Sequence, residues 1–324
     1  MAPTVRMPFE VVRPIFFWML VVLSASSTLI WLRALRWEYT PVTQFTAVVL
    51  TLGSLAAMQG LKLEQISLLV SGLVAIAVIL LMKDHPLPAG ILLAFATIKP
   101  QLVVLLLLWL AMWTLADWRR RYLWCASFLV TMIILLAASE WCLPHWIPRF
   151  WQALREYQDY TGAQRVLEKL VGTVWGRTLE ALAIAMMLDV CWTRRRQAAD
   201  TAGFVFAVSI ALGITVLVAP TYAVYNQVLL IPALLMLVEQ RGAMWRKNMA
   251  TRLLLTATAI LVVWPWIASV ALAAVSFILP RETVQRGWAV PFWSALLIPV
   301  GVASAMLVSG GQKSFAASAK AGTS

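Results

Sequence analysis

The sequence predicts an all-α fold, a polytopic bundle of transmembrane helices that forms a single domain over residues 1–308. Hydrophobic residues make up 62% of the chain and charged residues 12%, whereas a soluble globular domain is about half apolar and a quarter charged. The apolar residues form runs that approach or exceed the roughly 20 residues that cross a bilayer as a helix. These runs are continuous and rich in Leu and Ala, without the alternation typical of a membrane β-barrel.

The apolar runs divide the chain into about ten predicted spans, give or take one, by the length that a bilayer requires. They cover approximately residues 14–32, 42–58, 66–82, 89–116, 123–139, 179–192, 204–219, 224–238, 253–279 and 290–308. The first run ends in Arg33 and Arg36, which favours a retained span over a cleaved signal peptide. Residues 309–324 are small and polar, and we expect a disordered cytoplasmic tail there.

The basic residues predict how these spans are oriented. The net charge is +12, but the basic residues form short clusters between apolar runs, as in cytoplasmic loops, so we expect membrane lipids and no nucleic acid as partners. The clusters that we expect inside are residues 119–121, 194–196 and 241–252. We therefore expect a multi-pass protein of the inner (plasma) membrane, with residues 140–175 and 219–222 on the outside.

The N-terminal orientation depends on how the run over residues 89–116 is counted. If that run makes two short crossings, Arg33 and Arg36 lie inside and Met1 lies outside. If it makes one crossing, both positions are reversed. The charge pattern leaves the two alternatives open.

The outer segment, residues 140–175, contains an apolar pattern with helical spacing. The apolar positions are Leu143, Trp146, Ile147, Phe150, Trp151 and Leu154. We expect an amphipathic helix that lies flat in the membrane interface, where Trp is enriched. The alternative is an ordinary loop helix packed on the bundle.

The Lys99-Pro100-Gln101 step interrupts the longest apolar run. Proline restricts Lys99 to non-helical backbone and suits the first turn of the next helix, so the step predicts a broken helix at Lys99-Pro100. A helix N-terminus beside a lysine favours an anion, and Lys99 and Gln101 are therefore candidate ligands for a lipid phosphate. The alternative is a proline kink from which Lys99 reaches the headgroups.

Other polar residues near predicted span ends are candidates for lining a cavity. They are Glu64, Gln65, His145, Tyr222, Tyr225 and Asn226. Each has an ordinary alternative: an exposed carboxylate at a helix start, an incidental loop histidine, or side chains that cap and bridge helices. Arg177 and Glu180 lie one helical turn apart, and we expect them to form an ion pair.

The chain contains no P-loop, nucleophile elbow or metal-binding motif, and its three cysteines lack the C-x-x-C spacing. We therefore expect neither metal nor cofactor. Any reaction would be of the kind that a positioned carboxylate supports on a membrane-embedded substrate.

Three segments, in this order, resemble the glycosyltransferase 87 family. They are residues 64–69, residues 89–93 followed by Lys99-Pro100-Gln101, and residues 219–226 followed by 228–232. The resemblance covers roughly residues 15–240. It implies a GT-C fold and a polyprenyl-phosphate-mannose-dependent mannosyltransferase that works on the outer side, inverts the anomeric centre and uses a carboxylate as general base. Lys99 would then lie near the lipid phosphate.

The sequence departs from the family pattern in two places. No carboxylate matches the one that the family carries in its first outer loop, and Asn226 stands where members often carry His or Asp. The resemblance therefore implies an N-terminally shortened member, with an inactive fragment as one possibility. The alternatives are a non-catalytic membrane subunit and a lipid or sugar transporter. A transporter would carry paired intramembrane charges and an inverted repeat, and neither is visible in the sequence.

Overall fold

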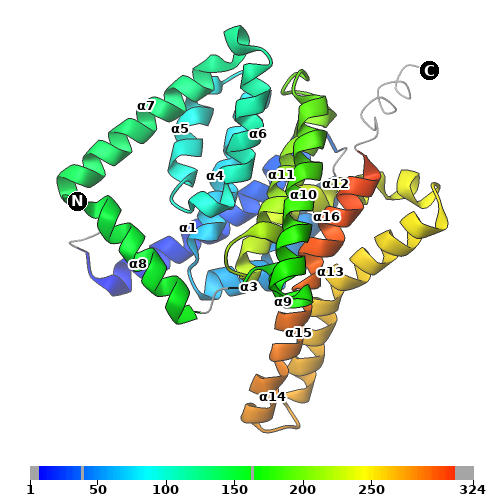
Figure 1. Cartoon of the computed structure of the whole chain (residues 1–324). Coiled ribbons are helices and arrows are strands. Elements are labelled where there is room, and N and C mark those ends of the chain that lie inside the picture. The colour runs from blue at the N-terminus through cyan, green and yellow to red at the C-terminus, as the bar shows by residue number, and fades with distance from the viewer. Residues whose placement is uncertain (1–6, 38–39, 162–163, 311–324) are drawn as a thin grey trace.

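The computed structural model describes residues 7–37, 40–161 and 164–310, and within these residues every regular element is a helix (Figure 1). The elements of the first half are α1 (Phe9–Ala34), α2 (Pro41–Leu52), α3 (Leu55–Lys62), α4 (Ile66–Met82), α5 (Pro86–Ala96), the 3₁₀ helix η2 (Pro100–Leu102), α6 (Val104–Leu115) and α7 (Trp118–Cys142). The remaining elements are α8 (Trp146–Thr161), α9 (Val166–Val171), α10 (Thr173–Arg194), α11 (Ala202–Val218), η3 (Val224–Leu230), α12 (Ile231–Trp245), α13 (Met249–Val275), α14 (Arg281–Gly287), α15 (Ala289–Ser294) and α16 (Leu297–Ser309). The predicted all-α class is confirmed.

Five helices are long and apolar enough to cross a membrane, counting the continuous segments Val224–Trp245 and Arg281–Ser309 as one helix each. The others are α1, α7 and α13. Helices α2 and α3 together make a sixth candidate, bent by 58° at a short break. Four apolar helices, α4, α5, α6 and α11, are shorter than a full span. The ten-span arrangement therefore stays a prediction, since length and composition support five or six.

Hydrogen bonds gather several basic helix ends at one end of the bundle, which we call the basic end. The Arg121 guanidinium on α7 donates to the Arg195 carbonyl after α10, at 2.7 Å. Arg36, just after α1, donates to the Asp200 carbonyl at 2.9 Å. Arg36 thus lies on the same side as the cluster at residues 194–196, which agrees with the alternative in which residues 89–116 cross twice.

The C-terminal helices reach the same end. Arg194 donates to the Gly310 carbonyl at 2.7 Å, and the Lys247 ammonium donates to the Val308 carbonyl at 3.0 Å. The turn between α12 and α13 is therefore at the basic end too. The tail was predicted over residues 309–324, but Ser309 is the buried last residue of α16; residues 311–324 lie outside the described residues.

Helices α5 and α6 form a hairpin that turns at the predicted break. Pro86, at the start of α5, and Asp117, just after α6, line one small cavity at the basic end. Both helices run from there to the opposite end, where Lys99 and Pro100 connect them. The predicted broken helix at Lys99-Pro100 is confirmed. At Gly90, α5 approaches α7 so closely that an added Cβ would lie 2.1 Å from the Trp124 carbonyl oxygen.

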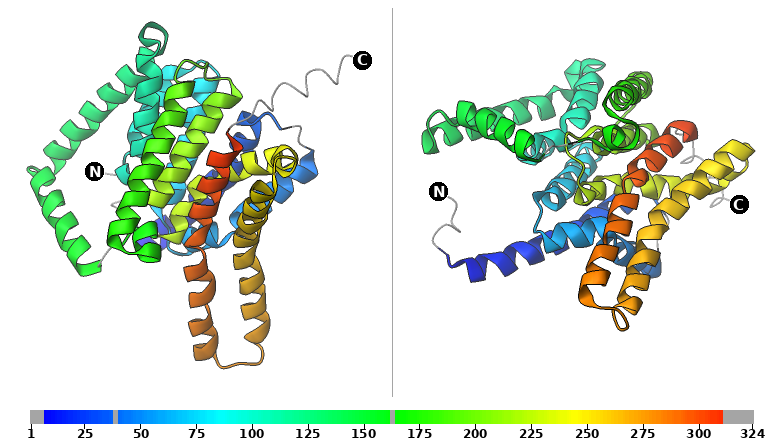
Figure 2. Two further views of the ribbon diagram at one scale, coloured as in Figure 1. Left: turned by 45° about the vertical axis from the view of Figure 1, so that its right-hand side comes forward. Right: turned by 60° about the horizontal axis from the view of Figure 1, so that its bottom comes forward.

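Helices α7 and α8 form an elbow that projects from the rest of the molecule (Figures 1 and 2). The predicted amphipathic helix is α8, and it begins at Trp146, so Leu143 precedes it. Three of its apolar side chains are exposed, Ile147 by 45%, Phe150 by 48% and Trp151 by 55%, whereas Trp146 and Leu154 are partly covered. Uncovered apolar side chains on a polar-faced helix favour the interfacial position over packing on the bundle.

Candidate functional site

The turn between α5 and α6 holds Lys99 beside the start of α4. Proline at position 100 keeps the Lys99 backbone out of the helical region, with φ −122° and ψ 78°. The half-buried ammonium donates to the Ser67 hydroxyl at 2.9 Å and to the Gln65 side-chain oxygen at 3.3 Å. Gln65 is the residue that precedes the first turn of α4. A positive charge is thereby fixed at the N-terminal end of a 17-residue helix.

The η3 segment supplies the other side of this site. The Ser67 hydroxyl donates to the Asn226 side-chain oxygen at 2.7 Å, and both residues are buried. The Lys99 ammonium also lies 4.9 Å from the centroid of the Tyr225 ring, a cation–π distance. Three segments far apart in the sequence therefore meet here. We call Gln65, Ser67, Lys99, Tyr225 and Asn226 the Lys99 cluster.

Glu64 adds a carboxylate at the edge of the Lys99 cluster, since it directly precedes Gln65. Its backbone is left-handed, with φ 50°, the conformation that commonly ends a helix, here α3. The carboxylate accepts a hydrogen bond from Nε of Arg13, on α1, at 2.7 Å.

The remaining predicted site residues lie outside the Lys99 cluster. Gln101 is exposed in η2, whereas the partners of Lys99 come from α4 and η3. His145 lies in the α7–α8 elbow, where its backbone N–H donates to Glu140 at 2.8 Å. The Tyr222 hydroxyl donates to the Phe292 carbonyl at 3.0 Å. Burial raises the pKa of Tyr222, so the hydroxyl stays protonated as this donor.

The predicted ion pair between Arg177 and Glu180 is wrong. Arg177 pairs with Glu168 at 2.9 Å, and Glu180 pairs with Arg165 at 2.6 Å. The reason is that α9 folds onto α10 at Gly176, where an added Cβ would lie 2.6 Å from the Glu168 backbone nitrogen. Helix α9 and its N-cap residue thus supply Glu168 as the partner of Arg177 and Arg165 as the partner of Glu180. The hydrogen bond from Arg177 holds the pKa of Glu168 below its usual range.

Two features of the site were missed in the sequence. Ser67 is the hydroxyl that joins Lys99 to Asn226, yet a serine in an apolar helix has no motif of its own. Its position in the segment 64–69, which carries part of the family resemblance, was the available signal. The pairing of Arg13 with Glu64 spans 51 positions, and local spacing contains no signal for it. Within the described residues, no three His, Cys, Asp or Glu side chains gather as metal ligands.

Comparison with known families identifies the chain. The model of glycosyltransferase family 87 matches residues 1–220, which is more than half of the sequence and includes α4 and the turn that carries Lys99. The chain therefore belongs to glycosyltransferase family 87, and the resemblance seen in the sequence is confirmed. Comparison with curated proteins and with solved structures gives no match.

Proposed function

We propose that this family 87 membrane glycosyltransferase takes its sugar from a polyprenyl-phosphate donor at the Lys99 cluster and transfers it to an acceptor hydroxyl. Mannose is the sugar that the family resemblance implies, and a GT-C fold, an outer-side reaction and an inner-membrane location are part of the same proposal. The cluster lies at the end of the bundle away from the basic end, which the charge pattern predicts to be the outer one.

The position of the Lys99 ammonium is the observation that carries this proposal. The N-terminal end of a helix carries a partial positive charge, so a second positive charge there is unfavourable unless an anion neutralises both. Ser67, Gln65 and Tyr225 hold the ammonium in place through neutral groups. A phosphate bound against Lys99 at the start of α4 would supply the missing negative charge.

Glu64 is our proposed general base. Arg13 holds its carboxylate at 2.7 Å, and its place next to Gln65 in the sequence puts it at the edge of the cluster. In the reaction, Glu64 takes the proton of the acceptor hydroxyl as the acceptor oxygen bonds to the anomeric carbon. The bond from that carbon to the phosphate oxygen breaks, and the polyprenyl phosphate leaves as an anion next to Lys99.

Transfer in proteoliposomes that contain a labelled polyprenyl-phosphate sugar tests the role of Lys99. We expect Lys99→Ala to lower the rate about 100-fold, as does the loss of one charge-stabilising donor in other enzymes. Lys83→Ala is the matched control, because Lys83 is exposed in the turn after α4, and its rate should equal that of the unaltered chain. An unchanged rate in Lys99→Ala would overturn the phosphate role.

A Glu64→Gln variant tests the base. The amide keeps the size of the side chain but cannot accept the proton, so we expect transfer to be lost while labelled donor still binds. Full transfer by Glu64→Gln contradicts the assignment. Movement of the labelled donor across the bilayer without transfer would favour the transporter alternative, and transfer that requires an added protein would favour the non-catalytic subunit.

A further inference from the structure

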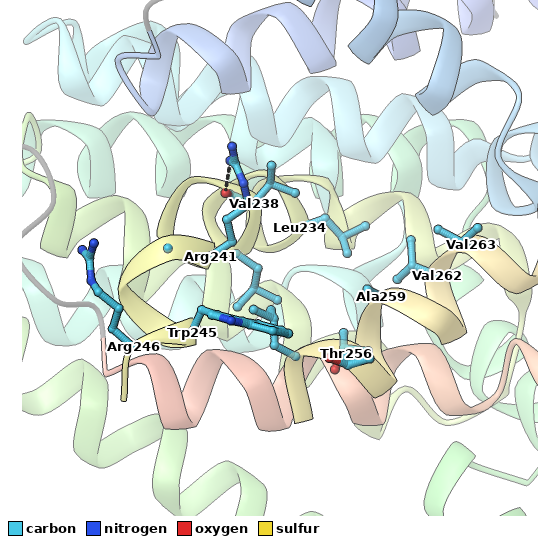
Figure 3. A pocket seen from close by; sticks show the side chains of 13 residues that line it. Leu234, Val238, Arg241, Trp245, Arg246, Thr256, Ala259, Val262 and Val263 are labelled. Carbon is cyan, nitrogen blue, oxygen red and sulfur yellow. Dashed lines mark hydrogen bonds between the residues drawn. The ribbon is translucent and has the colours of Figure 1, made fainter. Parts of the chain in front are cut away.

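Helices α12 and α13 enclose a groove of about 780 Å³ that the proposed reaction does not use (Figure 3). Its walls are mainly aliphatic, with Leu234 and Val238 on α12 and Ala259, Val262 and Val263 on α13. Val238 and Val263 are close to half exposed, so the groove opens at the surface of the bundle. An uncovered aliphatic groove on a membrane protein is a place where a lipid chain can lie.

The end of the groove near the α12–α13 turn is lined by basic and aromatic side chains instead of aliphatic ones. Arg241, Trp245 and Arg246 lie there; in Figure 3, Arg246 lies at the end opposite Val262 and Val263, and the Arg241 guanidinium, between them, donates to the Val238 carbonyl at 2.7 Å. Both arginines are exposed. Among the described residues that line the groove, two are arginines and none is acidic. The turn belongs to the basic end, as the bond from Lys247 to the Val308 carbonyl indicates.

The dimensions fit one leaflet of a bilayer. From Leu234 to Arg246 the helix rises about 18 Å at 1.5 Å per residue. Half of the hydrocarbon core is about 15 Å thick. An acyl chain along the aliphatic wall would therefore bring its headgroup to the level of Arg241 and Arg246, with the exposed Trp245 ring at the boundary.

We propose that this groove is a binding site for an anionic glycerophospholipid of the leaflet at the basic end. The acyl chain lies between α12 and α13, and the phosphate binds the Arg246 guanidinium together with the donors of Arg241 other than the one bonded to the Val238 carbonyl. Arginine suits phosphate because its planar donors match the phosphate oxygens. Basic sites of this kind at helix ends recognise anionic headgroups. The site is separate from the Lys99 cluster, since Asn226 and Arg246 mark opposite ends of the η3–α12 segment, and it lies outside the residues that match the family.

Native mass spectrometry of the purified full chain tests the proposal. Phosphatidylglycerol and phosphatidylcholine with identical acyl chains are titrated separately, and we expect one tightly bound phosphatidylglycerol per chain. The Arg241→Gln/Arg246→Gln variant should bind it about 30-fold more weakly, from the contribution of two arginines at a membrane surface. Arg281→Gln/Arg286→Gln is the matched control, because it removes the same charge from α14, and its affinity should not change.

Two further measurements separate the headgroup from the chain. Ala259→Trp fills the aliphatic wall and should weaken phosphatidylglycerol binding even though both arginines remain. Glycerol phosphate, which has no acyl chain, should not displace the lipid. Equal affinity for the two lipids, an equal loss in the control variant, displacement by glycerol phosphate, or a dimer that covers the groove would each overturn the proposal.

Discussion

The Lys99 cluster and the α12–α13 groove place positive charge next to apolar helices in opposite ways. In the cluster, one half-buried ammonium is fixed by Ser67 and Gln65. In the groove, two exposed arginines stand at the end of a long aliphatic wall. The cluster is preorganised to hold one charged group at one point, as a reaction requires. The groove, in our proposal, instead holds an acyl chain along its wall and an anionic headgroup at its basic end.

An all-or-none labelling experiment sharpens this comparison by locating the two regions on opposite sides of the membrane. Cys142, at the end of α7 away from the basic end, is exposed. In a Cys125→Ala/Cys191→Ala chain, we expect a membrane-impermeant maleimide to label Cys142 in intact spheroplasts. With Cys142→Ala and Arg246→Cys instead, labelling should require permeabilisation. Labelling of both positions from the same side would contradict the predicted orientation.

Gly90→Ala should break the cluster and spare the groove. The added Cβ would lie 2.1 Å from the Trp124 carbonyl oxygen, so the hairpin that carries Lys99 must move away from α7. We expect a loss of about 3 kcal/mol in stability, the upper range for overpacking, with loss of transfer and unchanged phosphatidylglycerol binding. Thermal unfolding in detergent measures the first effect. Gly213→Ala, with no atom within 4 Å of the new Cβ, is the control and should unfold no earlier than the unaltered chain.

Ser67→Ala should have a smaller effect at the same site. It removes the donor to the buried Asn226 oxygen and one partner of Lys99, which should cost about 1–2 kcal/mol and lower the transfer rate several-fold. Ser67→Thr keeps the hydroxyl and should retain more of the rate than Ser67→Ala. If the two variants transfer sugar equally, the hydroxyl does not position Lys99.

The smallest expected effect is a pH dependence at α9. Arg177 lowers the pKa of Glu168 in the folded chain, so the pair stabilises the fold above the ordinary carboxyl range and this contribution is lost as the pH falls through the folded value. The effect is small because Arg177 is 69% exposed. The hydrogen-exchange protection factors of the α9 backbone amides, which are corrected for the pH dependence of intrinsic exchange, should fall more between pH 7 and pH 3 in the unaltered chain than in Glu168→Gln. An equal fall would show that another group is responsible.

The sequence was sufficient where the structure depends on local rules. The Lys99-Pro100 step predicted the break, because proline restricts the backbone on both of its sides, whereas a cavity lined by Gln65, Tyr225 and Asn226 stays a prediction. The partners of Arg177 were predicted wrongly, because the close contact of α9 with α10 at Gly176 is tertiary. The number of spans also depends on tertiary structure. Helix α5 is shorter than a full span, and only the turn at Lys99-Pro100 shows that it and α6 form a hairpin.

The groove could not be predicted from the sequence at all. Leu234 and Val262 read as ordinary apolar residues of two spans, and hydropathy does not say how far apart two helices pack. Arg241 and Arg246 were identified only as markers of orientation. Their place at the mouth of a groove depends on the angle at which α13 leaves the turn.

The α5–α6 hairpin has a consequence for biosynthesis. Because the hairpin starts and finishes at the basic end, it adds two helices without changing the membrane orientation of the helices that follow it. During synthesis, α7 and the later helices therefore have the same orientation whether or not the hairpin has already packed against the bundle. Assembly of the Lys99 cluster is thereby separated from membrane insertion, and Lys99 can meet Ser67 and Asn226 after the remaining helices are in place.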